Sequence, residues 1–253
     1  MKPRLFHSVA AWRHTRAGAD FASRTVGFVP TMGALHAGHR ALLERARAEN
    51  ERVVLSVFVN PTQFNDPADL AKYPRTLAED VALADGLATD VFAPPPEEMY
   101  PDRYRYRVTE LEASRELEGA HRPGHFDGVL TVVLKLLNLV QPTRAYFGEK
   151  DWQQLALVRG MVDSLFLPCA IVACPTVREA DGLAMSSRNR RLAPADRARA
   201  AAFPRLLRAG TPEAATQALR DAGFAVDYVA ERDGVRLGAV HLGGVRLIDN
   251  VRL

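Results

Sequence analysis

Residues 25–49 read TVGFVPTMGALHAGHRALLERARAE, and this stretch decides the fold class. Residues 25–29 are mostly apolar and β-branched, which is typical of a strand, and residues 37–49 have the apolar spacing of a helix. Residues 52–59, RVVLSVFV, then form a continuous apolar run of the kind found in parallel strands that are buried on both faces. A strand, a helix and a second strand in this order predict a βαβ unit.

The same alternation continues along the first two thirds of the chain. We expect helices at residues 77–88, 126–139 and 151–165, and short strands at residues 90–93, 144–147 and 169–174. Strands separated by helical stretches of roughly 10–15 residues form mostly parallel sheets. The prediction is therefore an α/β fold with a Rossmann-like parallel sheet. In such sheets ligands bind at the carboxyl ends of the strands.

The pattern changes after about residue 176. Two helical stretches, residues 194–209 and 212–222, precede strand candidates at residues 225–229, 235–241 and 245–248. This order is typical of a small α+β domain. We therefore predict two domains: residues 1–176, a Rossmann-like catalytic domain, and residues 177–253, a small C-terminal domain.

Composition excludes several protein classes. Of the 253 residues, 47% are hydrophobic and 25% are charged, which is ordinary for a globular protein. The longest apolar run, residues 128–140, is too short to cross a bilayer, and the N-terminal stretch lacks the apolar core of a secretory signal. Cys169 and Cys174 lie too far apart on one strand to form a disulfide. We expect free, buried thiols in a cytoplasmic protein.

The net charge of +3 is unevenly distributed, because residues 178–208 contain eight arginines against three acidic residues. A non-catalytic RNA-binding protein is one interpretation of this stretch. The other is a solvated helix face beside one or two arginines that bind phosphate. Aromatic residues on which bases could stack do not accompany the charge, so we predict no nucleic-acid partner.

The turn between the first strand and helix carries the first candidate site. Gly33 and Gly38 let the backbone approach a ligand closely, and the free amides at the start of the helix favour an anion. His36 and His39 are three residues apart, so they project to one side of the helix start. Two histidines beside an anion site suggest donors to a phosphoryl oxygen. A zinc site would need a third ligand, and the HExxH pattern is absent.

Two further segments have the residues of an anion site. Residues 146–154, YFGEKDWQQ, follow a strand and open a helix, with Asp151 placed to cap it and Lys150 supplying a cation. Residues 181–189, DGLAMSSRN, lie at the predicted domain junction, where hydroxyls followed by Arg188 can bind triphosphate oxygens. An ordinary capped helix and a plain linker are the respective alternatives.

Residues 60–65, NPTQFN, follow the second long strand at its carboxyl end. Gln63 offers both a donor and an acceptor for a hydroxy acid or an amide. Gln154 lies one helical turn beyond Lys150 and could converge with it. We therefore expect this pair to bind a small polar substrate.

Together these segments resemble the pantoate–β-alanine ligases of the HxGH nucleotidyltransferase superfamily. The resemblance is dense from about residue 25 to residue 200, and looser beyond. HxGH alone indicates only nucleotidyl transfer, whereas its combination with the other segments is specific. The matching segments are PTMGALHAGH (30–39), FVNPTQF (58–64), KYPRT (72–76), HRPGHFDGV (121–129), YFGEKDWQQ (146–154), DGLAMSSRN (181–189) and, more weakly, RLIDN (246–250).

The resemblance implies a reaction. The family joins (R)-pantoate to β-alanine with ATP and Mg²⁺ through pantoyl adenylate, and it releases AMP and pyrophosphate. Its members are usually homodimers. The resemblance also makes Asp80 a candidate for contact with the metal ion. Because the adenylate is a mixed anhydride that water hydrolyses, we predict that the C-terminal domain closes as a lid through Ser186–Arg188.

The site residues implied by the resemblance fall into three groups. His39, as proton donor, His36, Lys150 and Arg188 would carry the chemistry. Gln63 and Gln154 would bind pantoate, with Gln63 also near β-alanine. The ATP site would comprise Met32, Gly33, Ala34, Leu35, His36, Ala37, Gly38, His39, Gly148, Glu149, Lys150, Asp151, Val177, Met185, Ser186, Ser187 and Arg188.

The nearest alternative is an adenylyltransferase of the same superfamily that acts on a phosphate acceptor. It would share the HxGH turn and the Ser/Arg loop. It gives no reason for NPTQF or for Gln154, so the ligase is the preferred hypothesis.

Overall fold

The structure is a computed structural model that describes residues 2–253, and the chain divides into two compact units. The first unit contains residues 2–35, His39–Phe147 and Gln153–Cys174. The second contains His36–Gly38, Gly148–Trp152 and Pro175–Leu253. Two short segments from within residues 1–176, His36–Gly38 and Gly148–Trp152, therefore belong with the C-terminal part.

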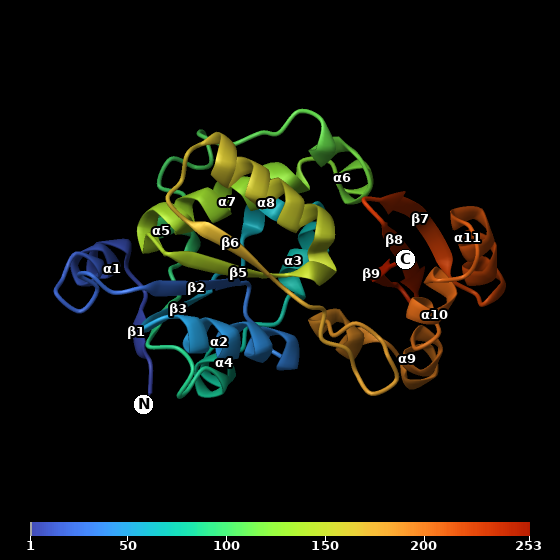
Figure 1. The fold of residues 1–253 in the computed structure, drawn as a ribbon, viewed down its shortest axis with the longest axis horizontal. Helices are drawn as coiled ribbons and strands as arrows, with labels where there is room; N and C mark the ends of the chain where they lie inside the picture. Colours follow the sequence, from blue (N-terminus) through green and yellow to red (C-terminus); the bar gives the residue numbers. More distant parts are fainter. Residues whose placement is uncertain (1) are drawn as a thin grey trace. The chain divides into compact units, whose positions relative to one another are not determined.

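The first unit is built on a six-stranded parallel sheet with the order β1-β4-β3-β2-β5-β6 (Figure 1). The order reverses at β2, which pairs with β3 on one side and with β5 on the other. The carboxyl ends of β2 and β5 are thus neighbours at the point where ligands bind in such sheets. The Rossmann-like prediction is confirmed. The strands are β1 (Arg4–Phe6), β2 (Val26–Thr31), β3 (Arg52–Val57), β4 (Asp90–Phe92), β5 (Arg144–Gly148) and β6 (Ala170–Cys174).

Helices cover both faces of this sheet, with α7 and α8 above it and α2 and α4 below it in Figure 1. Alternate residues of a strand point to opposite faces, so Val54 packs with the α7 and α8 side, whereas Val53 and Leu55 pack with α2 and α4. No helix of the described chain is long and apolar enough to span a membrane. The helices of this part of the chain are α1 (Val9–Arg16), α2 (Ala37–Glu49), α3 (Pro67–Ala71), α4 (Leu77–Leu83), α5 (Pro96–Met99), α6 (Glu118–His121), α7 (His125–Val140) and α8 (Trp152–Ser164).

Buried polar contacts fix the edge of the sheet that the sequence did not predict. Asp90 is fully buried in β4 and accepts hydrogen bonds from Arg4 of β1 at 2.7 Å and from Arg52 of β3 at 2.6 Å. Trp12 of α1 is also fully buried, and its indole N–H donates to the carbonyl of Leu139 at 2.8 Å. The N-terminal strand and helix are therefore held by long-range contacts rather than by their own pattern.

The second unit carries a three-stranded antiparallel sheet in the order β7-β8-β9, packed against short helices. The prediction of one helix over residues 194–209 is wrong, because the chain turns at residues 201–202 and Pro204 lies in the first turn of a new helix. The elements are α9 (Pro194–Ala200), α10 (Phe203–Leu207), α11 (Pro212–Asp221), β7 (Ala225–Arg232), β8 (Val235–Leu242) and β9 (Val245–Arg252).

Smaller differences concern helix ends and the cysteines. Helix α4 ends at Leu83, where turns take over, rather than at residue 88. Asp151 does not begin α8 as a cap, because it lies inside a 3₁₀ turn, Glu149–Asp151, that runs directly into the helix. Neither cysteine forms a disulfide among the described residues, and only Cys174 is buried. Partial burial still raises the pKa of the Cys169 thiol to about 11.

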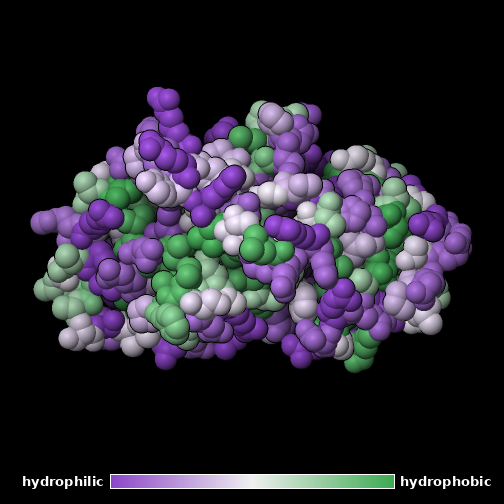
Figure 2. Space-filling model, turned by 90° about the horizontal axis from the view of Figure 1, so that it is seen from above, coloured by the Kyte–Doolittle hydropathy of each residue, from purple (hydrophilic) through white to green (hydrophobic). Residues whose placement is uncertain are grey.

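The surface of the larger unit has apolar patches among charged side chains, which appear green among purple in Figure 2. Leu165 and Phe166, at the turn between α8 and the edge strand β6, are 47% and 91% exposed. Phe166 also adopts a φ of 53°, a conformation that is uncommon for a residue with a side chain. Two large apolar side chains are therefore exposed on the surface at this turn.

Removing the Phe28 ring from the middle of β2 tests how tightly the sheet core is packed. Phe28 is fully buried, so Phe28→Ala is expected to lower the free energy of unfolding by about 3–5 kcal/mol. Denaturant unfolding measures this change. Tyr106→Ala is the control, because Tyr106 is 73% exposed and its loss should cost less than about 0.5 kcal/mol.

Candidate functional site

The loop after β2 is held by the carboxylate of Asp80, at the start of α4. Its oxygens accept hydrogen bonds from the backbone amides of Ala34, at 3.2 Å, and Leu35, at 2.8 Å. Gly33 and Ala34 have φ values of 81° and 52°, and a Cβ on Gly33 would lie 2.9 Å from Asp80 Oδ2. Asp80 is 2% exposed. Its carboxylate thus positions the loop, which does not support its candidacy as a metal ligand.

His36 is held in one tautomer by the glycine of the HxGH motif. The amide of Gly38 donates to His36 Nδ1 at 3.1 Å, so in the neutral ring the proton is on Nε2. A Cβ on Gly38 would lie 2.9 Å from His36 Cε1 and 3.0 Å from Nδ1. The glycine therefore makes room for the imidazole ring, and the Nε2–H is left as the donor of the neutral side chain.

Electrostatics keep His36 neutral. Burial, together with the positive charges of Lys150 and Arg190, lowers the pKa of His36 from 6.5 to about 4. The imidazole is consequently uncharged at neutral pH. A neutral Nε2–H beside an ammonium group is suited to donate a hydrogen bond to an anionic oxygen without carrying charge of its own.

Lys150 lies in the 3₁₀ turn Glu149–Asp151, which connects β5 to α8. This turn is fixed from strand β9, where the side-chain Nδ2 of Asn250 donates to the backbone carbonyls of Glu149 at 2.8 Å and of Lys150 at 3.0 Å. The carbonyls are thereby satisfied by a distant part of the chain. Asn250 positions the turn that carries Lys150.

Lys150, Ser186 and Arg188 line one small recess of about 10 Å³ in the second unit. Ser186 begins the 3₁₀ helix Ser187–Arg191, and its hydroxyl accepts a hydrogen bond from the amide of Arg188 at 3.2 Å. The amide of Met185 donates to the carbonyl of Val177 at 3.0 Å. The structure therefore brings together side chains that the sequence placed in separate segments.

An ion pair anchors this loop to β9. Arg178 donates to both carboxylate oxygens of Asp249, at 2.7 and 3.0 Å, and also to the carbonyl of Gly182 at 3.0 Å. Arg197 pairs with Glu179 and Asp181, each at 2.6 Å. Two of the arginines between residues 178 and 208, Arg178 and Arg197, are thus paired with carboxylates inside this unit.

Gln63 and Gln154 both belong to the first unit. Gln63 ends the 3₁₀ turn Pro61–Gln63 after β3, and its side-chain oxygen accepts from Asn60 Nδ2 at 3.0 Å. Gln154 is half-buried near the start of α8, and its side chain has no hydrogen-bond partner among the described residues. The adjacent Gln153 is committed to the backbone of Ala113, Glu116 and Glu118.

The remaining predicted residues lie along the same segments. Met32 and His39 are half-buried, and His39 lies in the first turn of α2. Asp80, Asn60, His125 and Asn250 were not predicted as site residues from chemistry. In the sequence, these four residues are marked only by their place in or beside the segments that match the family. Asp80 follows KYPRT, and the others lie within FVNPTQF, HRPGHFDGV and RLIDN.

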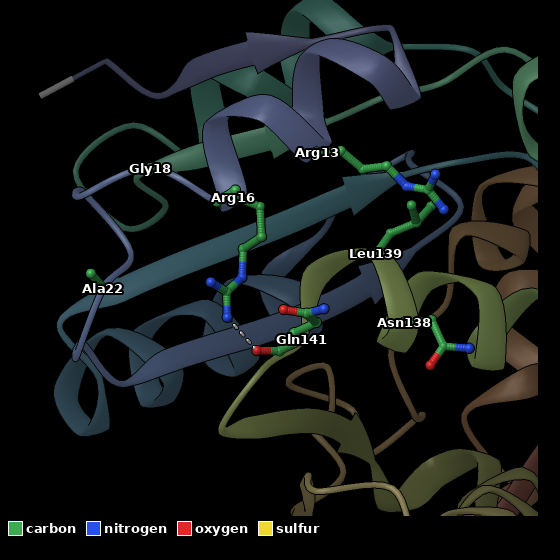
Figure 3. Close-up of a pocket in the computed structure, with 8 residues that line it drawn as sticks. Arg13, Arg16, Gly18, Ala22, Asn138, Leu139 and Gln141 are labelled. Atoms are coloured by element: carbon green, nitrogen blue, oxygen red, sulfur yellow. Dashed lines mark hydrogen bonds between the residues drawn. The ribbon is translucent and has the colours of Figure 1, made fainter.

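A separate cavity of about 460 Å³ lies at the end of α7 (Figure 3). Arg16 reaches this end from α1 and donates to the carbonyls of Val140 at 2.6 Å and Gln141 at 2.9 Å. Gln141 lies shortly before β5 begins at Arg144, so this is the amino-terminal edge of the sheet. The cavity is therefore at the edge opposite the carboxyl ends of the strands, and Arg16 caps a helix there.

The geometry also shows whether any side chains cluster closely enough to bind a metal ion. Among the residues that the structure describes, no group of three or more His, Cys, Asp or Glu side chains could hold a metal ion.

Comparison with known proteins decides the family. The model of the pantoate–β-alanine ligase family matches residues 4–252. The pantothenate synthetase of Bdellovibrio bacteriovorus is 56% identical over 245 residues, which cover 96% of this chain and 95% of that protein. The chain belongs to the pantoate–β-alanine ligase family.

Solved structures agree. A pantothenate synthetase from Thermus thermophilus is similar with a TM-score of 0.90 and 45% identity, covering 98% of this chain and 99% of that one. A pantoate–β-alanine ligase from Francisella tularensis, complexed with β,γ-ATP and β-alanine, is similar with a TM-score of 0.94 and 38% identity, covering 99% and 97%.

Membership of the pantoate–β-alanine ligases confirms the resemblance found in the sequence and makes the chain a ligase. The adenylyltransferase alternative is not supported, because full-length relatives carry the ligase name.

The neutral state of His36 can be tested by NMR titration of its imidazole. The midpoint is expected at about 4, and Lys150→Ala should raise it because a positive charge that disfavours the imidazolium is removed. Lys72→Ala, at an exposed position, is the matched control and should leave the midpoint unchanged. A midpoint at the ordinary value of 6.5 would contradict the assignment.

Proposed function

We propose that this ligase activates (R)-pantoate with ATP to pantoyl adenylate and then transfers the pantoyl group to β-alanine, with release of AMP and pyrophosphate. The observation that carries this proposal is the neutral His36, with its proton on Nε2, beside the charge of Lys150. The Francisella relative complexed with β,γ-ATP and β-alanine supports ATP and β-alanine as two of these substrates.

In the first step the pantoate carboxylate attacks the α-phosphorus of ATP, and the bond to pyrophosphate breaks. Negative charge grows on the phosphoryl oxygens, so fixed donors that are already aimed at them lower the barrier. We assign this role to Lys150 and Arg188, with His36 Nε2–H as a neutral donor and His39 as the proton donor. In the second step the β-alanine amine attacks the acyl carbon, and AMP leaves.

The ATP site that we propose combines three backbone segments with few charged side chains. The loop after β2 contributes backbone held by Asp80, the β5–α8 turn contributes Lys150, and the loop before α9 contributes Arg188. Its members are Met32, Gly33, Ala34, Leu35, His36, Ala37, Gly38, His39, Gly148, Glu149, Lys150, Asp151, Val177, Met185, Ser186, Ser187 and Arg188.

Pantoate is assigned to Gln63 and Gln154, and β-alanine to the neighbourhood of Gln63. Uncharged amides suit the hydroxyl groups of pantoate. We assign Mg²⁺ to the ATP phosphates rather than to a protein cage, because this ion keeps substrate and water oxygens as ligands and because the Asp80 oxygens are already bound by amides.

Two further proposals concern the assembly of the chain and its location. We propose that the chain is a cytoplasmic homodimer, for which the exposed Leu165 and Phe166 offer apolar surface. A mass of 27.8 kDa by light scattering, which is that of the monomer, would count against the dimer.

We also propose that the C-terminal domain, residues 177–253, closes as a lid. A lid would keep water from the reactive adenylate. Unchanged proteolysis of Ser186–Arg188 on addition of ATP and pantoate would count against it.

The proposed reaction is tested by following the conversion of ATP to AMP. AMP is expected to accumulate with pantoate and β-alanine together, whereas pantoate alone should give bound adenylate and pyrophosphate. RNA in place of these substrates should give no turnover. Formation of an adenylylated phosphate compound as product would instead favour an adenylyltransferase.

Substitution of the proposed charged and proton-donating groups should slow adenylation. Lys150→Ala and His39→Ala are each expected to lower the rate of pyrophosphate release roughly 10²–10³-fold, because contacts strongest in the transition state are lost. Thermal unfolding should change little, since Lys150 is only half-buried. Lys72→Ala serves as the control, and normal turnover of either variant would refute the role given to that residue.

A further inference from the structure

Gln63 is held by hydrogen bonds at both its side chain and its backbone. It is 9% exposed at the end of the turn that follows β3. Contacts to it come from Asn60 in the same turn, from Arg122 at the end of α6 and from His125 at the start of α7. All these residues belong to the first unit.

The side-chain contact fixes which end of the Gln63 amide is the donor. Asn60 Nδ2 donates to the carbonyl of Gly128 at 3.1 Å, and a carbonyl can only accept, so this atom is the amide nitrogen. The same Nδ2 lies 3.0 Å from the Gln63 side chain, which must therefore present its oxygen, Oε1. Gln63 Nε2 is left as a donor with no partner among the described residues.

Tyr100 holds Asn60 in this orientation. Its hydroxyl donates to Asn60 Oδ1 at 2.7 Å, and the Thr62 hydroxyl donates to the same oxygen at 2.9 Å. Burial raises the pKa of Tyr100 to about 12, so the phenol stays protonated. The order of donors therefore runs in one direction, from Tyr100 through Asn60 to Gln63.

The backbone contact fixes the tautomer of His125. A guanidinium has only donors, so Arg122, 3.0 Å from His125 Nε2, must donate to that nitrogen. The proton of the neutral ring is then on Nδ1, which donates to the carbonyl of Gln63 at 2.8 Å. Arg122 donates to the same carbonyl at 3.2 Å. Two donors thus hold the Gln63 backbone.

Close packing leaves little freedom in this arrangement. A Cβ on Gly128 of α7 would lie 2.5 Å from the carbonyl oxygen of Thr62 and 2.8 Å from the amide of Gln63. Helix α7 therefore approaches the turn at a glycine, and the turn is clamped between Asn60 and His125.

We propose that Tyr100, Arg122 and His125 are positioning residues for the acid substrate, because they orient Gln63 so that its Nε2–H₂ donates to a hydroxyl oxygen of pantoate. This inference rests on the proposed function, in which Gln63 binds pantoate. It assigns the direction of the hydrogen bond and the groups that impose it.

Steady-state kinetics test the positioning role. Tyr100→Phe and His125→Phe are each expected to raise the KM for pantoate about tenfold and to leave the KM for ATP within about twofold, because one hydrogen bond of the chain is lost. His125→Asn can still donate to the Gln63 carbonyl, so it should recover part of the loss. Tyr106→Phe, at a 73% exposed tyrosine, is the matched control and should behave as the unsubstituted enzyme.

Pantoate analogues that lack either the 2-hydroxyl or the 4-hydroxyl separate positioning from general damage. One of the two analogues lacks the hydroxyl that Gln63 contacts. Tyr100→Phe should weaken binding of pantoate but not of that analogue, because the substitution and the missing hydroxyl remove the same hydrogen bond. Equal losses with pantoate and both analogues, or an unchanged KM for pantoate, would overturn the inference. If Tyr100→Phe does not fold, the His125→Phe and His125→Asn pair decides with the same analogues.

Failure of the underlying function gives a different result. An unsubstituted enzyme that forms no AMP from ATP, pantoate and β-alanine would refute the proposed function. An active enzyme whose Tyr100 and His125 variants bind pantoate normally would refute only the positioning role.

Discussion

The buried carboxylate of Asp80 accepts two hydrogen bonds that hold the chain where β2 ends, and the candidate site depends on them. They fix the amides of Ala34 and Leu35 while Ala34 has a φ of 52°, a conformation that an alanine adopts at a cost in energy. His36 follows directly in the chain, and its imidazole Nδ1 accepts a hydrogen bond from the amide of Gly38. The glycine at position 38 then leaves space for that ring.

The sequence predicted the elements that have a strong local pattern. The apolar runs of β2 and β3 and the spacing of α2 were sufficient, and α2 has the predicted bounds. The strand and helix at the N-terminus were missed because their stability comes from Asp90 and from the burial of Trp12, both distant in sequence. The break between α9 and α10 was missed because alanine and arginine favour helix on both sides of it.

The motif residues of the site were predictable as residue types, but their protonation and orientation were not. The sequence placed His36 beside an anion site, yet its neutral state depends on burial and on Lys150, more than a hundred residues away. It likewise offered Gln63 as either donor or acceptor. The carbonyl of Gly128 accepts from Asn60 Nδ2, which fixes the orientation of the Asn60 amide. Asn60 Nδ2 then donates to Gln63 Oε1, so Gln63 is left to donate through Nε2. Such properties exist only once the tertiary contacts have formed.

The contact of Asn250 with the Lys150 turn has a consequence for biogenesis. The two residues are separated by 100 positions, so the ribosome must add that length of chain before the turn acquires its support. Contacts of long sequence separation form late in folding. A nascent or partly folded chain would therefore lack a properly placed ammonium group, and competence to consume nucleotide would arise only after β9 has joined its sheet.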